Sequence, residues 1–376
     1  MKSEFVIYVT TYQGLEEVLL EELRQNKIGS KHEIRKRGVA FVGNMDDVYR
    51  SNYTLRTALR VLINLVSFEI NSNDDLYDHG KKIEWEKYFY PQKTIAIDAV
   101  VRTEVFKNSV FAAQLLKDSI CDRFIDLGSE RPDVDLKNAD IRIHLLIAGN
   151  RCTISLDSSG DSLHKRGYKT VSGKAPLSEV LAAGLIQLSN WDGNSYLFDG
   201  MCGSGTLLTE AYMNSRNVAA GKFRNNFCFK QWRMFERADW LALKKSMDGE
   251  QRNSKTPITG SDNHPYALED ARMNLASAGF EHFVDVFKKD FFTSPAPAES
   301  GLLIMNPPYD KRITLADAKQ FYAEIGDKLK SDYKGWTAAI FSANIPAIKA
   351  LGLKPKRRIP LWNGPLEGRL MLYNLY

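Results

Sequence analysis

The second half of this 376-residue chain alternates short apolar strands with helices, and this alternation constrains the fold more than any other feature. Strands that alternate with helices of ordinary length form a parallel, doubly wound sheet. We therefore expect an α/β domain there. The predicted strands are 195–199, 257–262, 283–286, 302–305 and 336–341, and the predicted helices are 177–188, 206–213, 267–278 and 316–329.

The first half of the chain mixes strands and helices without βαβ spacing, which predicts α+β modules. Strands are expected at 5–10, 39–42, 94–101, 141–148 and 153–157, and helices at 15–25, 47–67 and 108–127. Residues 158–174 are rich in Ser, Gly and Lys, which is typical of a connector between domains. A domain boundary is therefore expected near residue 160.

Composition narrows the class of protein. Hydrophobic residues make up 44% of the chain, enough to bury real cores and to exclude disorder of the whole. No apolar run approaches the ~18 uncharged residues of a membrane helix, and the start of the chain lacks signal-peptide features. A cytoplasmic location is therefore expected. The four Cys and six His show no CxxC or HxxxH pattern, so we expect neither a disulfide framework nor a metal site.

Positive charge gathers in one segment, residues 216–255. It contains ten Lys and Arg against four Asp and Glu, a surplus of six, whereas the whole chain has a net charge of +5. Basic residues interleaved with aromatic ones suit a nucleic-acid surface. The alternative is a solvated helical insertion whose aromatic rings pack inward, and the sequence leaves both interpretations open. The six rings are Phe223, Phe227, Phe229, Trp232, Phe235 and Trp240.

The first chemical signal is a glycine-rich turn between a strand and a helix. The strand ends in Asp199, and Gly200, Gly203 and Gly205 follow before a helix starts at Thr206. Glycines let a ligand approach the backbone closely, and the helix start offers free N–H groups. The pattern is neither the dinucleotide fingerprint nor a P-loop. An acid at this turn suits a cationic amino-acid head group better than a pyrophosphate, although the motif alone could be an ordinary βα turn.

Two further acids end predicted strands. Asp262 closes the second strand, where an acid commonly accepts hydrogen bonds from a ribose diol. Asp290 follows the third strand and could accept a hydrogen bond from the exocyclic amine of adenine. Taken singly, Asp262 could be a helix cap and Asp290 a solvated loop acid. Their order along the chain is what favours a ligand site.

The fourth signal is Asn306-Pro307-Pro308-Tyr309, which follows an apolar strand. Prolines stiffen the loop and remove backbone donors. Asn306 then offers a side-chain carbonyl, Pro307 a backbone carbonyl and Tyr309 a ring face. Two acceptors beside an aromatic plate suit a planar group that bears an NH₂. The alternative, a turn that merely uses prolines, does not explain the three acids that precede it.

These motifs in this order resemble the class I S-adenosylmethionine-dependent methyltransferases that act on planar amines. More narrowly, the chain resembles the THUMP-domain RNA guanine-N2 methyltransferases of the bacterial large-subunit rRNA type, over nearly its whole length. The family's Asp-Pro-Met-Cys-Gly-Ser-Gly-Thr run corresponds to residues 199–206. Further matching runs are 14–17, 55–60, 83–85, 157–160, 163–168, 174–177 and 363–370.

The resemblance implies an N-terminal ferredoxin-like region (1–55), a THUMP RNA-binding domain (56–160) and a Rossmann-like methyltransferase domain (161–376). It implies S-adenosylmethionine as cofactor and RNA, most simply 23S rRNA, as partner. The implied catalytic residues are Asn306, Pro307 and Tyr309. The implied cofactor-binding residues are Leu177, Asp199, Gly200, Cys202, Gly203, Gly205, Asp262, Asp290 and Asn306.

Two residues depart from the family pattern: Gly200 replaces the usual proline, and Asp310 stands where glycine is usual. The chain also ends after one methyltransferase domain, so the second activity of fused relatives is expected to be absent. Alternatives stay open. The substrate could be a tRNA guanosine, an adenine N6 amine or a protein glutamine, and the protein could be a non-catalytic RNA-binding assembly factor.

Overall fold

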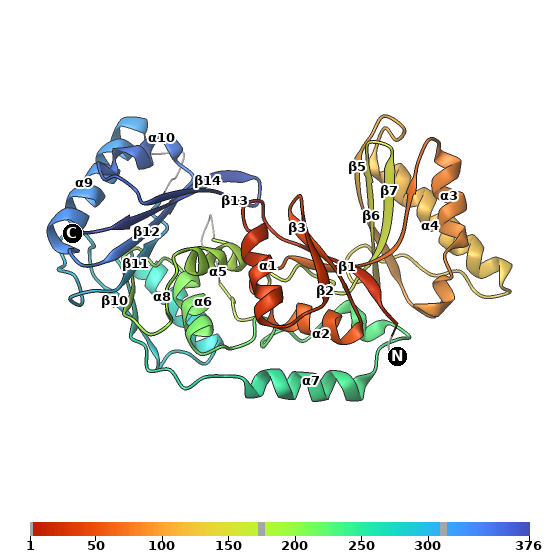
Figure 1. The fold of residues 1–376 in the computed structure, drawn as a ribbon, viewed down its shortest axis with the longest axis horizontal. Coiled ribbons are helices and arrows are strands. Elements are labelled where there is room, and N and C mark those ends of the chain that lie inside the picture. Colours follow the sequence, from red (N-terminus) through yellow and green to blue (C-terminus); the bar gives the residue numbers. More distant parts are fainter. Residues whose placement is uncertain (1–2, 172–176, 309–313) are drawn as a thin grey trace.

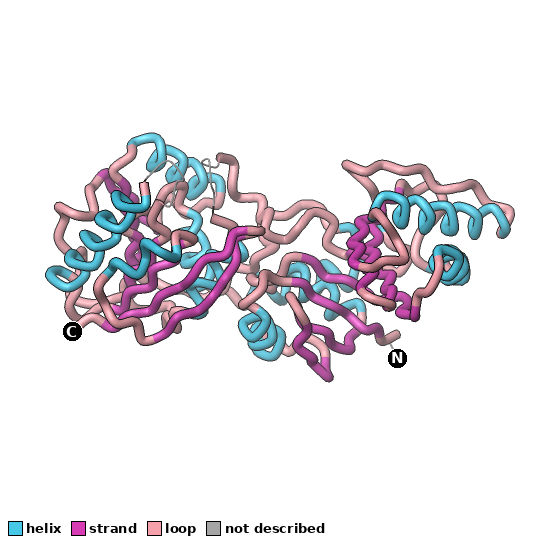
Figure 2. The backbone as a smooth tube through the Cα atoms, turned by 90° about the horizontal axis from the view of Figure 1, so that it is seen from above, coloured by secondary structure: helices cyan, strands magenta, loops and turns pink. Residues whose placement is uncertain are grey.

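The structure is a computed structural model that describes residues 3–171, 177–308 and 314–376. The molecule is elongated, with one seven-stranded sheet in each half (Figure 1). Seen from above, the helices of residues 73–126 lie at the end farthest from the C-terminal sheet (Figure 2). No helix within the described ranges is long and apolar enough to cross a membrane.

The N-terminal sheet is continuous across the predicted ferredoxin-like and THUMP regions. Its strand order is β2-β3-β1-β4-β7-β6-β5, and all neighbours are antiparallel except β5 and β6. The strands are β1 (Phe5–Thr10), β2 (Ser30–Arg35), β3 (Gly38–Gly43), β4 (Arg60–Glu69), β5 (Ile95–Arg102), β6 (Ile141–Ala148) and β7 (Arg151–Asp157). The helices are α1 (Glu16–Gln25), α2 (Met45–Thr54), α3 (Asn73–Lys82) and α4 (Ser109–Asp126).

The long helix predicted at 47–67 is wrong in its second half. Helix α2 ends at Thr54, because Leu55 is extended, and residues 60–69 form strand β4. Strand β4 pairs with β1 on one side and β7 on the other. Two ladders of backbone hydrogen bonds and burial on the sheet outweigh the local helical pattern, since β propensity depends strongly on such context.

The C-terminal sheet confirms the predicted α/β class. Its order is β10-β9-β8-β11-β12-β14-β13; the first five strands are parallel, and β14 and β13 are antiparallel to their neighbours. The strands are β8 (Leu197–Asp199), β9 (Ile258–Asp262), β10 (Val284–Lys288), β11 (Leu302–Met305), β12 (Thr337–Ser342), β13 (Arg357–Asn363) and β14 (Leu366–Asn374). The helices are α5 (Glu179–Leu188), α6 (Thr206–Ser215), α8 (Pro265–Ser277), α9 (Leu315–Asp332) and α10 (Ile345–Ile348).

The basic segment 216–255, here called the clasp, leaves the C-terminal domain after α6 and carries helix α7 (Arg237–Gly249) along the N-terminal half (Figure 1). Its aromatic rings pack inward. The ring of Trp240 lies 5.8 Å from that of Tyr49 and 5.5 Å from that of Tyr53, both on α2. Phe229 is fully buried. The inward interpretation is therefore confirmed for Trp240 and Phe229, and the clasp joins the two halves.

Buried charged residues also join the halves. The guanidinium of Arg56, just after α2, donates to the backbone carbonyls of Met213 (3.1 Å) and Val218 (2.8 Å), at and beyond the end of α6. Glu22 on α1 accepts hydrogen bonds from the backbone N–H of Arg56 and from the side chain of Gln187 on α5. These bonds fix the N-terminal half against the helices behind the glycine-rich turn.

Candidate active site

The order of the C-terminal sheet reverses between β8 and β11, which lie side by side. In an open parallel sheet, ligands bind outside the carboxyl ends of the strands where the order reverses. Three of the predicted residues stand at those ends. Asp199 ends β8, Asp262 ends the neighbouring β9, and Asn306 follows β11 directly. The fold therefore brings together groups that lie more than 100 residues apart in sequence.

The glycine-rich turn needs two of its glycines for their conformation. Gly203 and Gly205 have φ values of 53° and 76°, in the left-handed region, and Gly205 is the residue before α6. A Cβ added at Gly203 would meet nothing within 4 Å, so a ligand can approach the backbone there.

Gly200 is required for packing. A Cβ at this position would lie 2.5 Å from the Phe291 ring, so Phe291 fills the space that the family's usual proline needs. The departure from the family pattern at Gly200 is thus matched by this neighbouring aromatic ring.

Asp262 joins the second strand to the turn. Its Oδ2 accepts a hydrogen bond from the backbone N–H of Gly203 (3.0 Å), and its Oδ1 accepts one from the N–H of His264 (2.9 Å). Cys202, 6% exposed, donates its backbone N–H to the Ser261 carbonyl. Asp262 therefore shapes the turn, and each of its oxygens keeps a lone pair for a further donor.

Asp199 is a buried acid, 1% exposed. Its Oδ1 accepts a hydrogen bond from the N–H of Met201 (3.1 Å), and it forms no ion pair within the described residues. Burial raises the pKa of Asp199 to about 8, with a smaller contribution from the nearby charge of Asp262, while the Met201 hydrogen bond acts in the opposite direction. A cationic ligand group would relieve this desolvation.

Asn306 carries an unsatisfied acceptor. Its Oδ1 is buried and makes no hydrogen bond with any described residue. An unpaired buried acceptor costs about 1–3 kcal/mol, so it is kept where a ligand can satisfy it. Pro307 next to it is buried. Tyr309 and Asp310, the remaining predicted residues of this loop, lie outside the described residues.

The other predicted residues occupy separate positions. Asp290, in the loop after β10, accepts a hydrogen bond from the N–H of Phe292 (2.7 Å). Leu177, 7% exposed, precedes α5. A separate cavity of about 990 Å³ is lined by Leu177 but by no other predicted site residue that the structure describes.

The sequence did not reveal the role of Asn274, which positions the glycine-rich turn. Asn274 on α8 is buried, and its side chain donates to the Ser204 carbonyl of the glycine-rich turn (3.0 Å). Its Oδ1 accepts hydrogen bonds from the backbone N–H groups of Thr170 (2.9 Å) and Val171 (3.2 Å). These partners lie 70 to 104 residues away, and no local pattern around Asn274 indicates them.

The hydrogen-bonding groups of the site fit the predicted cofactor, S-adenosylmethionine. Asp199 offers an anionic partner for an ammonium group, Asp262 offers acceptors for ribose hydroxyls, and the open backbone at Gly203 leaves room beside both. Within the described residues, no group of three or more His, Cys, Asp and Glu could hold a metal ion.

Three family models match the chain. The RlmL ferredoxin-like domain matches residues 6–62, the THUMP domain residues 71–157, and the RMKL-like methyltransferase domain residues 166–371. The last model covers more than half of the chain. The boundaries predicted at residues 55 and 160 stay a prediction.

Curated relatives are also named as RNA methyltransferases. A Synechocystis protein named as a putative RNA methyltransferase is 38% identical and aligns over 98% of this chain and 96% of its own length. The ribosomal RNA large subunit methyltransferase K/L of Psychromonas ingrahamii is 36% identical over 98% of this chain but 50% of its own length. The chain thus spans about half the length of the K/L relatives.

Solved structures share the whole fold. SMU.472, described as a putative methyltransferase complexed with SAH, has a TM-score of 0.90 and 26% identity, covering 100% of this chain and 99% of that one. A possible methylase from Clostridium difficile has a TM-score of 0.90 and 27% identity, with the same coverage. SAH is what remains of S-adenosylmethionine after methyl transfer, so the predicted cofactor is confirmed. From its matched domain and these relatives, the chain belongs to the RMKL-like methyltransferase family.

Proposed function

We propose that this protein transfers a methyl group from S-adenosylmethionine to the exocyclic N2 amine of a guanosine in RNA, most specifically in 23S rRNA. The unsatisfied buried oxygen of Asn306, at the reversal point of the sheet, is the observation that carries the proposal. The THUMP match in the N-terminal half and the rRNA substrate in the names of the K/L relatives support RNA as the substrate.

The donor is held by residues of three neighbouring loops. S-adenosylmethionine supplies a methyl group activated by a positively charged sulfur. Asp199 accepts from the ammonium of the methionyl part, Asp262 from the ribose hydroxyls and Asp290 from the adenine amine, while Leu177, Gly200, Cys202, Gly203 and Gly205 complete the walls. The open backbone at Gly203 and the burial of Asp199 support these assignments.

The acceptor amine is held by the loop after β11. The lone pair of the guanine N2 amine is delocalised into the ring, so the amine is a weak nucleophile. The Asn306 side-chain oxygen and the Pro307 carbonyl accept hydrogen bonds from its two N–H groups and turn the lone pair toward the methyl group. As the methyl group leaves the sulfur, the amine gives up one proton to solvent. Tyr309 stacks on the base. Positioning of this kind supplies most of the rate enhancement, because no covalent intermediate is needed.

The target base has to leave its helix. The N2 amine of a stacked, paired guanine cannot reach the strand ends of a buried sheet, so the enzyme acts on an unpaired or flipped nucleotide. A flipped base also presents both N–H bonds of the amine to Asn306 and Pro307.

Nucleoside mass spectrometry tests the proposal directly. Purified protein is incubated with 23S rRNA transcript, tRNA or a protein extract, together with isotopically labelled S-adenosylmethionine. The expected product is labelled N2-methylguanosine from the 23S transcript. Label in tRNA guanosine, in N6-methyladenosine or in protein glutamine would contradict the proposed substrate. Donor binding without transfer to any of them would support a non-catalytic assembly factor.

A further inference from the structure

The strand-end site does not account for the cavity of about 990 Å³, here called the interdomain cavity, which shares only Leu177 with the described residues proposed for that site. Its walls come from the THUMP region, the connector, the clasp and the catalytic domain. They include residues 137–140, 142, 159–161, 164–167, 169–171, 177–179, 223–228 and 230–231. It therefore lies where the proposed RNA-binding half meets the domain that holds the methyl donor.

The lining carries a surplus of positive charge. Among the described residues it contains seven Lys and Arg side chains against three Asp and Glu, together with the exposed amides Asn225 and Asn226. Sites for small molecules are about 300–1,000 Å³ and mostly apolar. A cavity at the top of that size range with a surplus of cations suits a chain of phosphates better than a small apolar ligand.

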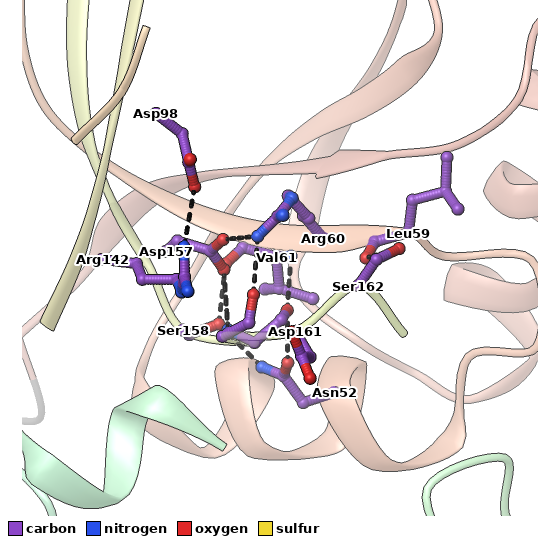
Figure 3. A network of polar contacts seen from close by, with 12 residues as sticks. Asn52, Leu59, Arg60, Val61, Asp98, Arg142, Asp157, Ser158, Asp161 and Ser162 are labelled. Atoms are coloured by element: carbon purple, nitrogen blue, oxygen red, sulfur yellow. Dashed lines mark hydrogen bonds and ion pairs between the residues drawn. The ribbon is translucent and has the colours of Figure 1, made fainter. Parts of the chain in front are cut away.

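Ser159 and Gly160, which line the cavity, are held by a buried polar network at the start of the connector (Figure 3). Arg60 pairs with Asp157 and donates to the Gly160 carbonyl (2.7 Å). Asn52 on α2 donates to the Ser158 hydroxyl and accepts from the Ser159 hydroxyl, both at 2.7 Å. Although residues 158–171 contain no helix or strand, these bonds hold their beginning in one conformation.

Arg224 of the clasp braces the same wall. Its guanidinium donates to four connector carbonyls at 2.7–3.3 Å, those of Ser159, Asp161, Ser162 and Lys165. Burial lowers the pKa of Arg224 to about 10, with a smaller effect from Arg166, so it stays cationic at neutral pH. Its charge adds to the positive charge of the cavity, although its Nη atoms donate to the connector and only its Nε has no partner among the described residues.

Three lysines of the lining come from three different segments. Lys137 is exposed and forms no ion pair within the described residues. Lys165 pairs with Asp161 at 3.4 Å, but both side chains are more than 60% exposed, and such pairs are worth little. Lys230 donates to the Asn225 carbonyl of its own segment. Lys137 and Lys165 can therefore turn to a phosphate at small cost, whereas Lys230, half-buried and 5.6 Å and 5.8 Å from the ring centres of Phe227 and Trp240, gives up these ring contacts to do so.

We propose that the interdomain cavity binds a single-stranded segment of the RNA substrate through its phosphates, with Lys137, Lys165 and Lys230 as the contacting cations. This inference rests on the proposed function, because it assumes an RNA substrate. It adds a second contact region between the THUMP region and the strand ends, so that the RNA is gripped close to the target nucleotide.

The cavity wall is connected to the donor site. Thr170 and Val171 line the cavity and donate to Asn274, which in turn donates to the Ser204 carbonyl of the glycine-rich turn. The buried side chain of Asn274 therefore connects the wall that would contact an RNA strand to the turn that is proposed to hold the methyl donor.

The test replaces the three lysines with glutamine together: Lys137→Gln, Lys165→Gln and Lys230→Gln. RNA affinity is measured with a 23S fragment at several salt concentrations, and donor affinity is measured by calorimetry. The matched control replaces Lys319, Lys334 and Lys354, which are exposed on the catalytic domain and do not line the cavity. It removes the same charge at other places.

We expect the cavity variant to bind RNA roughly tenfold or more weakly at low salt, with a slope of log affinity against log salt smaller by about 2, since each single-strand phosphate contact contributes about 0.7. Donor affinity should stay unchanged, the melting temperature should fall by about 4 °C at most because Lys230 loses its contacts with Phe227 and Trp240, and the control should match the unsubstituted protein. Equal slopes for the two triple variants would overturn the proposal. If the unsubstituted protein itself binds no RNA, the proposed function fails instead.

Discussion

The strand-end site and the interdomain cavity both contain polar groups, but the charged groups at the two places have opposite signs. Among the described residues, the Asn306 oxygen at the strand ends has no partner and the buried acid Asp199 has no cation beside it. In the cavity, the Nη atoms of Arg224 donate to connector carbonyls, its Nε has no partner among the described residues, and Lys and Arg outnumber Asp and Glu. A buried acid together with an unpaired acceptor indicates where a small polar group is held, whereas surplus positive charge indicates where a polyanion lies.

The largest expected effect concerns the clasp, which joins the two regions. Trp240→Ala removes a ring that packs against Tyr49 and Tyr53, so it should destabilise the protein by about 3–5 kcal/mol. Urea unfolding measures the change. The control Leu241→Ala, on the exposed side of the same helix, should change stability by about 0.5 kcal/mol or less. Equal unfolding midpoints for the two variants would contradict an inward-packed clasp.

The second effect concerns chemistry at the strand ends. Asn306→Ala removes the unsatisfied acceptor and should lower the rate of methyl transfer about 10²–10³-fold, as loss of a preorganised polar group typically does. Asn306→Asp keeps an acceptor and should lose less. Single-turnover transfer with both substrates saturating measures the rates. A rate for Asn306→Ala close to that of the unsubstituted protein would leave the loop as only a structural turn.

A smaller effect is expected on donor binding. Asp262→Ala should weaken donor affinity by about 1.5–3 kcal/mol, the range for hydrogen bonds to a charged group. Because Asp262 also accepts from the Gly203 and His264 N–H groups, Asp262→Asn serves as the control that keeps the size of the side chain and one of these two acceptors. Calorimetry gives both affinities, and a donor affinity unaffected by alanine would remove Asp262 from the ribose site.

The most gradual effect, at most about tenfold per pH unit, is a pH dependence. Burial raises the pKa of Asp199 to about 8, and only the ionised form pairs with the donor's ammonium. Below pH 8 the carboxyl must lose its proton on binding, so donor affinity should fall by up to about tenfold per pH unit from 8 to 6. The Asp199→Asn variant should bind the methyl donor weakly, and its donor affinity should no longer show this dependence on pH between 6 and 8. Identical profiles for the two proteins would show that Asp199 does not titrate on binding.

The positions of Asp199, Asp262 and Asn306 at the strand ends could be predicted from the sequence because the signals for them are local. Each strand, its terminal acid and the following turn lie within about ten residues, and a parallel sheet then gathers the carboxyl ends at one edge. The same reasoning failed where distant pairing decides the structure. Residues 60–67 resemble a helix in isolation, yet they become the strand between β1 and β7.

Distance in sequence also explains what stayed ambiguous. The basic and aromatic composition of the clasp allowed its rings to face RNA or the protein interior. Tyr49, against which Trp240 packs, lies almost 200 residues earlier, and no sequence pattern within the clasp reports it. Asn274 was missed for the same reason, because its partners Ser204 and Val171 become neighbours only in the folded chain.

In this account, catalysis is assigned to the strand-end site and RNA binding to the interdomain cavity. The most direct test measures the rate of methyl transfer at increasing RNA concentration and saturating methyl donor. Asn306→Ala should lower the plateau rate about 10²–10³-fold and leave the half-saturating RNA concentration unchanged. The triple lysine variant of the cavity should raise the half-saturating concentration roughly tenfold or more and leave the plateau unchanged. The opposite assignment, with Asn306→Ala affecting only half-saturation or the lysine variant only the plateau, would contradict it.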